Sequence, residues 1–151
     1  MTTPILKFKE QFEFLSNFFM CAITYDGIVY PSTEHAYQAA KAMNHVDKIR
    51  ISRLKTPGEA KREGRKIAMR PDWDQIKDQV MYDICKMKFS IPYFKTQLLL
   101  TGDAYLEEGN NWHDNYWGVC GCNNCPQHRV FPKEQQNHLG KVLMQIRAEL
   151  L

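Results

Sequence analysis

The chain has 151 residues, of which 44% are hydrophobic, 25% charged and 12% aromatic. This length and composition are typical of one globular domain with its own hydrophobic core, so we expect a single domain over residues 1–151. The formal net charge of only +3 argues against nucleic acid as the default partner, and no apolar run is long enough to span a membrane.

The N-terminus and the cysteines predict a cytoplasmic protein. Met1 is not followed by an apolar run of the kind that forms a signal peptide. Five cysteines, an odd number, argue for free thiols in a reducing compartment. We therefore expect a cytoplasmic protein that does not bind membranes.

The first predicted elements are strands. Residues 5–8 are interpreted as a short strand, and two β-prone runs, at 21–25 and 28–30, flank the dipeptide Asp26-Gly27. This dipeptide between β-prone runs is a strong hairpin signal. The hairpin leads directly into a helix, for which Ser32 or Thr33 is the expected N-cap.

The rest of the chain is predicted to be mostly helical. Pro57 suits a first helical position, and Gly140, which costs a helix roughly 1 kcal/mol relative to alanine, indicates close packing. Residues 109–127 are expected to form a long ordered loop. Helices are expected at residues 34–41, 46–54, 57–67, 74–89, 93–100 and 134–151. The predicted fold class is mainly α with a small N-terminal β-hairpin, on the border of α+β.

The first helix carries a polar stripe. Glu34, Gln38 and Lys41 recur at i, i+4 and i+7, which places a carboxylate, an amide and an amine on one face. A lysine amine can attack an electrophilic sugar carbon when its pKa is lowered, and a nearby carboxylate can move protons. The same spacing also suits an ordinary solvated Glu–Lys face.

Lys88 is a second candidate amine, because it continues an apolar row formed by Met81 and Ile84. Its alternative interpretation is a side chain that snorkels at the edge of the core. The stretch between Lys48 and Lys66 holds eight basic residues, which suit phosphates or a solvated helix face.

Two further clusters follow in the long loop. Asp114, Asn115 and Trp117 combine an acid, an amide and an aromatic ring, which suits stacking on a flat ring or filling the core under a loop. Cys120, Cys122 and Cys125 can hold a structural zinc ion or can be reduced, packed thiols. The fourth ligand expected for zinc is His113 or His128, and His138 is another possible ligand.

Taken together, ordered segments of the chain resemble the NADAR (NAD- and ADP-ribose-associated) family from about Phe12 to Leu151. The similar segments are Phe14-Leu-Ser-Asn-Phe18, Asp26-Gly27, Tyr30-Pro-Ser-x-Glu-His-Ala-Tyr-Gln-Ala-x-Lys41, Gly64-Arg65, Asp72-Trp73, Met81, Lys88-Phe89, Thr101-Gly-Asp103, Leu106-x-Glu108, Asp114-Asn-Tyr-Trp-Gly118, and Asn137-x-Leu-Gly-Lys-x-Leu-Met144 through Arg147. Each segment alone is a weak signal, and the ordered set is specific.

The resemblance implies a compact, mainly helical N-glycosidase that removes ADP-ribose from guanine or hydrolyses a phosphoribosylamino intermediate of riboflavin synthesis. It implies a lysine Schiff-base mechanism with no cofactor for the chemistry. The catalytic residues would be Glu34 and Lys41, with Lys88 as the other amine. The substrate-binding residues would be Asn17, Tyr37, Gln38, Gly64, Arg65, Asp114, Asn115 and Trp117.

The resemblance also sets the expected partners and the alternatives. The partner would be an ADP-ribose-containing or phosphoribosyl small molecule, or ADP-ribosylated DNA or RNA. We expect the helix from Glu34 to Lys41 and the loop from Asp114 to Gly118 to bound one pocket. One alternative is a non-catalytic ADP-ribose-binding module. Another, which rests on the cysteines and the basic stretch and not on the resemblance, is a zinc-stabilised nucleic-acid adaptor.

Overall fold

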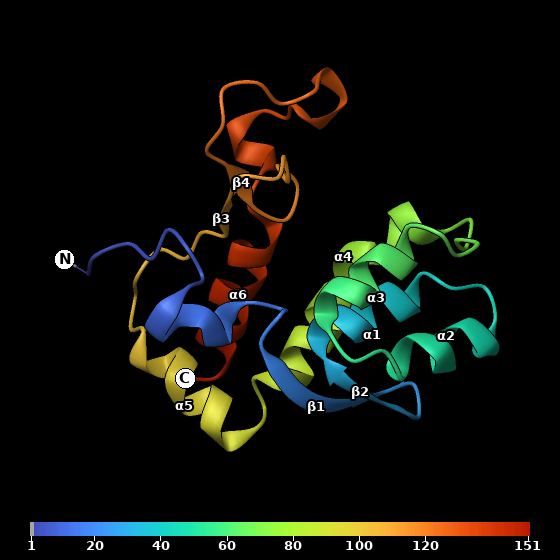
Figure 1. The fold of residues 1–151 in the computed structure, drawn as a ribbon. Coiled ribbons are helices and arrows are strands. Elements are labelled where there is room, and N and C mark those ends of the chain that lie inside the picture. The colour runs from blue at the N-terminus through green and yellow to red at the C-terminus, as the bar shows by residue number, and fades with distance from the viewer. Residues whose placement is uncertain (1) are drawn as a thin grey trace. The chain divides into compact units, whose positions relative to one another are not determined.

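The computed structural model describes residues 2–151 and is mainly helical with a small hairpin, as the sequence predicted (Figure 1). It divides into two compact units: unit 1 comprises the chain up to Ser16 together with Pro92–Leu151, and unit 2 comprises Asn17–Ile91. One domain over residues 1–151 stays a prediction. Within the part of the chain described, no helix is long and apolar enough to cross a membrane.

Unit 2 begins with the hairpin. Strands β1 (Met20–Tyr25) and β2 (Ile28–Ser32) pair antiparallel, with Tyr25 opposite Ile28. Asp26 and Gly27 lie between them with φ angles of 54° and 81°. Two successive left-handed residues match the right-handed twist of a hairpin, and Asp-Gly adopts them readily. The predicted hairpin is therefore confirmed.

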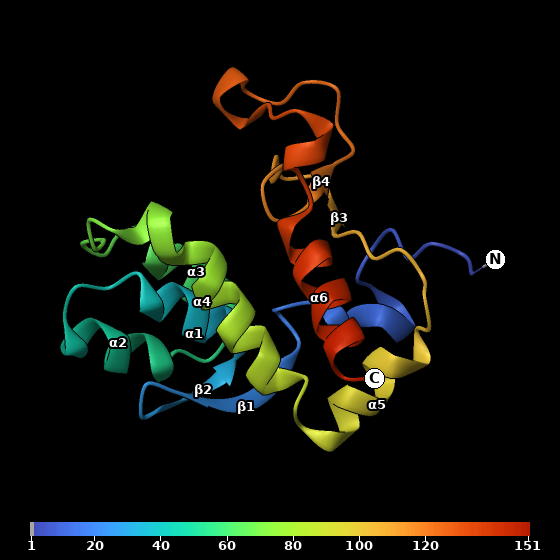
Figure 2. The same cartoon turned by 180° about the vertical axis from the view of Figure 1, so that it is seen from behind.

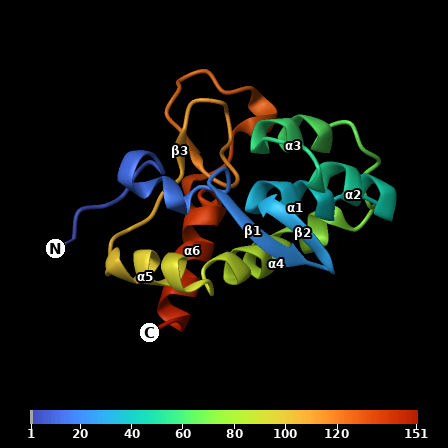
Figure 3. The same cartoon turned by 60° about the horizontal axis from the view of Figure 1, so that its bottom comes forward.

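Four helices complete unit 2: α1 (Thr33–Ala40), α2 (His45–Ser52), α3 (Pro57–Gly64) and α4 (Trp73–Lys88). Helix α1 is the central element, because it packs against α2, α3, α4 and the hairpin and all its residues are buried. Figure 2, seen from behind, shows α4 running in front of α1, and Figure 3 shows the β1–β2 hairpin beside both helices. The third predicted helix, expected over residues 57–67, ends at Gly64.

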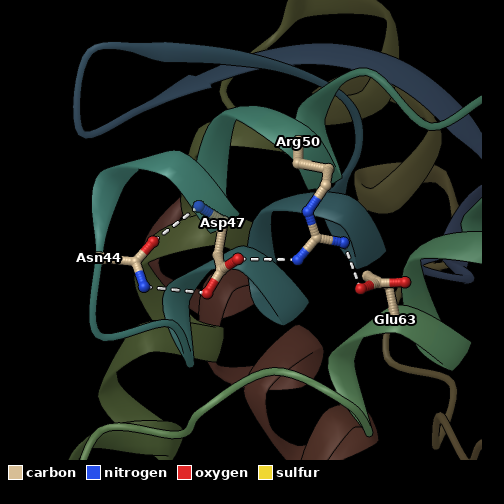
Figure 4. Close-up of polar contacts among 4 residues, drawn as sticks. All are labelled: Asn44, Asp47, Arg50 and Glu63. Atoms are coloured by element: carbon tan, nitrogen blue, oxygen red, sulfur yellow. Dashed lines mark hydrogen bonds and ion pairs between the residues drawn. The ribbon is translucent and has the colours of Figure 1, made fainter.

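Polar contacts join α2 to α3 at the surface (Figure 4). Asn44 caps α2 by accepting a hydrogen bond from the Asp47 amide at 2.9 Å. Arg50 donates to the Asp47 carboxylate at 2.7 Å and also forms an ion pair with Glu63 of α3. One of the eight basic residues of this stretch is therefore already neutralised by two carboxylates.

Unit 1 holds the remaining elements. They are the 3₁₀ helices η1 (Glu10–Leu15), η2 (Gln127–Arg129) and η3 (Lys133–Gln135), the helices α5 (Pro92–Leu100) and α6 (His138–Glu149), and the short strands β3 (Gly109–Asn110) and β4 (Val119–Cys120). Strands β3 and β4 pair in parallel, inside the segment predicted to be a loop.

Two predictions for unit 1 are wrong in detail. Residues 5–8 form no strand, since only Ile5 makes an isolated bridge, to Leu106. The last helix begins at His138 rather than at residue 134, because Asn137 has a left-handed φ of 60° that a helix cannot include. The close packing predicted at Gly140 is confirmed, because a Cβ atom there would lie 2.1 Å from the Leu106 carbonyl oxygen.

Candidate active site

Glu34 lies in the first turn of α1, where the backbone amides favour a carboxylate. Ser32 begins the helix as its N-cap, with its hydroxyl accepting a hydrogen bond from the His35 amide at 3.1 Å. One turn on from Glu34, the Gln38 side chain donates from Nε2 to Glu34 Oε1 at 2.8 Å. Both side chains are buried, so the amide holds the carboxylate in one orientation.

Gly64 of α3 makes room for Gln38. A Cβ atom at position 64 would lie 1.9 Å from Gln38 Oε1, well inside van der Waals contact. Only glycine therefore permits this conformation of Gln38. The buried Oε1 atom has no hydrogen-bond partner within residues 2–151. The sequence-based role of Gly64 at a phosphate stays a prediction, and the structure adds a packing role.

Lys41 follows α1 as its C-cap, with Nζ 5.6 Å from the centre of the Tyr37 ring. Burial lowers the pKa of Lys41, the Glu34 carboxylate raises it, and the cations of Arg65, Lys61 and Lys77 lower it. Glu34 is thus the carboxylate that acts electrostatically on this amine, and the three cations oppose its effect. The lysine is more easily deprotonated than a solvated one.

Lys88, at the end of α4, is fully buried, so the interpretation as a side chain snorkelling at the core edge is wrong. Its Nζ atom lies 5.2 Å from the centre of the Phe89 ring and 5.9 Å from that of Phe19. Burial lowers the pKa of Lys88 to about 8, and the Cys21 and Cys85 thiols oppose this shift. Lys88 therefore remains a second candidate for a neutral amine.

Two other predicted substrate-binding residues belong to the packing around α1. The Asn17 Oδ1 atom accepts a hydrogen bond from Thr33 at 3.0 Å, and its Nδ2 atom lies 3.3 Å from Met81 Sδ. The Tyr37 ring packs on Trp73 with centroids 5.2 Å apart. Substrate binding by Asn17 and Tyr37 stays a prediction.

Asp114, Asn115 and Trp117 belong to unit 1, in the turn that precedes β4. Asp114 Oδ1 accepts hydrogen bonds from the backbone amides of Tyr116 and Trp117, at 3.0 and 2.9 Å. Asn115 is buried, and its Oδ1 accepts from the Cys120 amide at 3.0 Å. Because these residues and Glu34 lie in different units, the expected shared pocket stays a prediction.

The three loop cysteines gather around a histidine. The ligand atoms of His113, Cys120, Cys122 and Cys125 all lie within 4.8 Å of one another. The Cys122 sulfur is 3.2 Å from that of Cys120 and 3.3 Å from that of Cys125, and His113 Nδ1 is 3.3–4.0 Å from the three sulfurs. This set can hold a metal ion. The structure thus includes His113 in the cluster and leaves out His128.

The sequence analysis missed the position of Cys21. Cys21 raises the pKa of Lys88, whereas the pKa of Cys21 itself is raised by burial and lowered by Lys88. Cys21 lies on β1 and Lys88 on α4, so no spacing in the sequence could have indicated the contact.

The chain is similar in sequence to known proteins over nearly its whole length. A NADAR domain model matches residues 6–151. An N-glycosidase of Nostoc punctiforme is 35% identical over 99% of this chain and 93% of its own length. A riboflavin biosynthesis protein of Vibrio vulnificus is 35% identical over 99% of this chain, which spans only 39% of that protein.

A solved structure agrees with these sequence matches. The NMR structure of Escherichia coli YbiA has a TM-score of 0.80 with this chain at 32% identity, and the match covers 99% of this chain and 86% of YbiA. The Escherichia coli protein carries the name N-glycosidase YbiA and is 33% identical over 89% of this chain and 79% of its own length. The resemblance noted in the sequence is therefore confirmed, and the chain belongs to the NADAR family.

Proposed function

We propose that the protein is an N-glycosidase, a hydrolase acting on N-glycosyl bonds, and that Glu34 and Lys41 carry its chemistry. The observation that supports this most directly is a buried carboxylate on α1 that acts electrostatically on Lys41, the C-cap of the same helix, whose pKa burial lowers. Its relatives from Nostoc punctiforme and Escherichia coli are named N-glycosidases. The substrate is an ADP-ribosyl or phosphoribosyl conjugate.

In the proposed reaction, the lone pair of neutral Lys41 Nζ forms a bond to the anomeric carbon of the ribose. The carbon–nitrogen bond breaks, and its electron pair leaves with the base or amine, which takes up one proton from Nζ by way of the Glu34 carboxylate. The bond between the anomeric carbon and the ring oxygen then breaks as the imine forms, and the other Nζ proton passes through Glu34 to that oxygen. Water adds to the imine carbon, with Glu34 moving its proton to Nζ, and cleavage of the carbon–nitrogen bond releases the free lysine amine and the ring-opened sugar aldehyde.

The cations around Lys41 suit the phosphates of such a substrate. The charges of Arg65 and Lys61 both lower the pKa of Lys41. A phosphate bound there would partly neutralise them. We assign Arg65 to this role together with the predicted contribution of Gly64.

For cofactors, we propose that the chemistry uses only side chains and water, and that His113, Cys120, Cys122 and Cys125 hold a structural zinc ion. Tetrahedral zinc with Zn–S bonds of about 2.3 Å places its ligand atoms about 3.8 Å apart. Here the Cys120–Cys122 and Cys122–Cys125 sulfur pairs and the three distances from His113 Nδ1 to the sulfurs are 3.2–4.0 Å, and all four ligand atoms lie within 4.8 Å of one another. Three thiols and an imidazole are also ligands that zinc prefers.

Two substrates and a trapping reagent test the proposal. Guanine-ADP-ribosylated DNA and a phosphoribosylaminouracil are each incubated with the protein, and base or amine release is measured. Borohydride added during turnover should reduce the imine and fix the sugar on Lys41, as located by mass spectrometry. Lys41→Arg should still bind ADP-ribose but lose at least 100-fold in turnover, whereas the control Lys95→Arg, on α5, should not change it.

The other outcomes decide between mechanisms. An adduct on Lys88 would exchange the roles of the two lysines. No adduct together with an active Lys41→Arg variant would mean that Glu34 activates water directly. Binding of ADP-ribose without release from either substrate would contradict the enzyme and support a non-catalytic ADP-ribose-binding module.

A further inference from the structure

The turn Asp114–Trp117 is attached on one side to the four-residue metal-ligand cluster. His113 immediately precedes the turn and has a φ of 69°, a backbone conformation that is unusual for a residue other than glycine. Within the turn, Asn115 Nδ2 donates to Cys125 Sγ at 3.2 Å and to the Arg129 carbonyl at 2.8 Å. Asn115 Oδ1 accepts from the Cys120 amide at 3.0 Å.

The other side of the turn is attached to α6. The carbonyls of Tyr116, Trp117 and Gly118 accept from the amides of His138, Leu139 and Asn137, at 2.9, 3.0 and 3.2 Å. The Tyr116 ring also stacks on His138 with centroids 4.0 Å apart and an angle of 4° between the planes. These contacts come from a regular helix and do not depend on the cysteines.

The Asn115 side chain is therefore the link between the cluster and the turn. Asn115 is buried. Its Nδ2 atom donates to the Cys125 sulfur and to the carbonyl of Arg129, four residues further on, and its Oδ1 atom accepts from the Cys120 amide. A metal ion that fixes Cys120 and Cys125 also fixes the donors and acceptors that hold Asn115. Without the ion, the cysteines and His113 are joined only by hydrogen bonds of thiols, which are weak donors and acceptors.

We infer that zinc bound by His113, Cys120, Cys122 and Cys125 acts as a positioning device for the turn Asp114–Trp117, with Asn115 as the positioning residue. The inference rests on the structural zinc ion proposed above. It adds that the ion fixes the conformation of a turn that is predicted to bind substrate. Zinc availability would then control the order of this turn.

The first measurement is zinc content after purification without chelator and with a reducing agent. We expect one zinc per chain, which His113→Ala should lose and His128→Ala should keep, since His128 is exposed and outside the cluster. Cobalt in place of zinc should give the charge-transfer absorption of cobalt–thiolate bonds. No zinc in the parent protein and no such absorption would overturn the metal site itself.

The second measurement is amide hydrogen exchange with and without zinc. The amides of Tyr116 and Trp117, which donate to Asp114, should exchange at least tenfold faster after zinc is removed. The amides of the β1–β2 hairpin in unit 2 provide the internal control and should not change. Unchanged exchange at Tyr116 and Trp117 after confirmed loss of zinc would overturn the positioning role, although zinc binding would stand.

An Asn115 variant tests the link while the metal is present. Asn115→Ala should keep one zinc but raise exchange at Tyr116 and Trp117 at least threefold. Asn123→Ala, an exposed asparagine in the same loop, is the matched control and should change neither quantity. Parent-like exchange in Asn115→Ala would overturn the role of Asn115, even if zinc removal unfolds unit 1. None of these readouts uses glycosidase activity, so they fail or succeed independently of the proposed reaction.

Discussion

At the scale of single residues, Gly64 shows how one missing side chain orients a carboxylate. Gly64→Ala would place a Cβ atom 1.9 Å from Gln38 Oε1 and push Gln38 away from Glu34. Overpacking of this kind costs about 1–3 kcal/mol. We expect that loss in the free energy of unfolding by urea titration, together with at least a tenfold loss of turnover.

Gly58, in the first turn of the same helix, is the matched control for Gly64. A Cβ atom there would meet nothing closer than the Arg62 guanidinium at 3.6 Å. Gly58→Ala should therefore leave turnover unchanged and raise stability by up to about 1 kcal/mol, the helix preference for alanine. Equal effects of the two substitutions would show that the contact between Gly64 and Gln38 does not matter.

Lys88 should make the free energy of unfolding depend on pH in the alkaline range. Burial lowers its pKa from 10.5 to about 8, so between these values the unfolded chain holds a proton that the folded chain has lost. Stability should therefore rise with pH across this window. Below pH 8 both states are charged and the burial penalty, up to about 3 kcal/mol, is fully present.

Lys88→Met removes that penalty. Its advantage in melting temperature over the parent should be greatest at pH 7 to 8 and should vanish near pH 10.5, whereas Lys86→Met on the same helix should show no such trend. A Lys88→Met protein that is less stable at every pH would mean that contacts of the charged amine outweigh its desolvation. Lys88 would then be a structural cation rather than a candidate nucleophile.

At the scale of elements, the start of α1 depends on Ser32. Its hydroxyl accepts from the His35 amide at 3.1 Å and lies 2.6 Å from His35 Nδ1, and both residues are buried. Ser32→Ala removes a cap, worth about 1 kcal/mol, and leaves a buried imidazole nitrogen unpaired, worth about 1–3 kcal/mol more. Urea titration should give a loss of about 2–4 kcal/mol.

Thr56 is the matched cap for comparison. It caps α3 through the Glu59 amide at 3.1 Å, on the surface. Thr56→Ala should lose only about 1 kcal/mol. Because Ser32 begins the helix that carries Glu34, its substitution should also lower the turnover of the folded fraction. If Ser32→Ala loses no more free energy of unfolding than Thr56→Ala, the buried contact between the Ser32 hydroxyl and His35 Nδ1 does not add to stability.

The elements predicted well from the sequence are those with local signals. The Asp26-Gly27 turn, the Ser32 cap and Pro57 at the start of α3 each specify a backbone conformation within a few residues. The features that the sequence did not predict depend on contacts between residues far apart in the chain. The pairing of β3 with β4 and the isolated bridge of Ile5 with Leu106 join segments whose match no sequence period reveals.

The candidate site divides in the same way. The stripe of Glu34, Gln38 and Lys41 followed from helical spacing, because Glu34 and Gln38 lie on α1 and Lys41, its C-cap, keeps helical backbone angles. The choice of His113 over His128 did not follow from spacing, since both are near the cysteines in sequence and only the loop conformation separates them. Cys21 beside Lys88 depends on the packing of the hairpin against α4.

At the scale of the whole molecule, charge separates a small-ligand enzyme from a nucleic-acid adaptor. The net charge is +3, and the basic stretch from Lys48 to Lys66 is partly neutralised where Arg50 pairs with Asp47 and Glu63. A protein that contacts six to ten phosphates of DNA loses about 10³–10⁵ in affinity between 50 and 200 mM salt. Arg50 is therefore committed to two carboxylates, and a net charge of +3 is small for a protein that binds nucleic acid mainly through its phosphates.

We therefore expect weak dependence on salt. The affinity for ADP-ribose, measured by calorimetry between 50 and 200 mM sodium chloride, should fall by about tenfold or less, because a ligand with two phosphates displaces few counterions. An unmodified oligonucleotide of the same base composition as the modified substrate should bind more weakly than ADP-ribose at 200 mM. Tighter oligonucleotide binding with a loss of 10³ or more over this range would instead indicate an adaptor in which the basic stretch follows a nucleic-acid backbone.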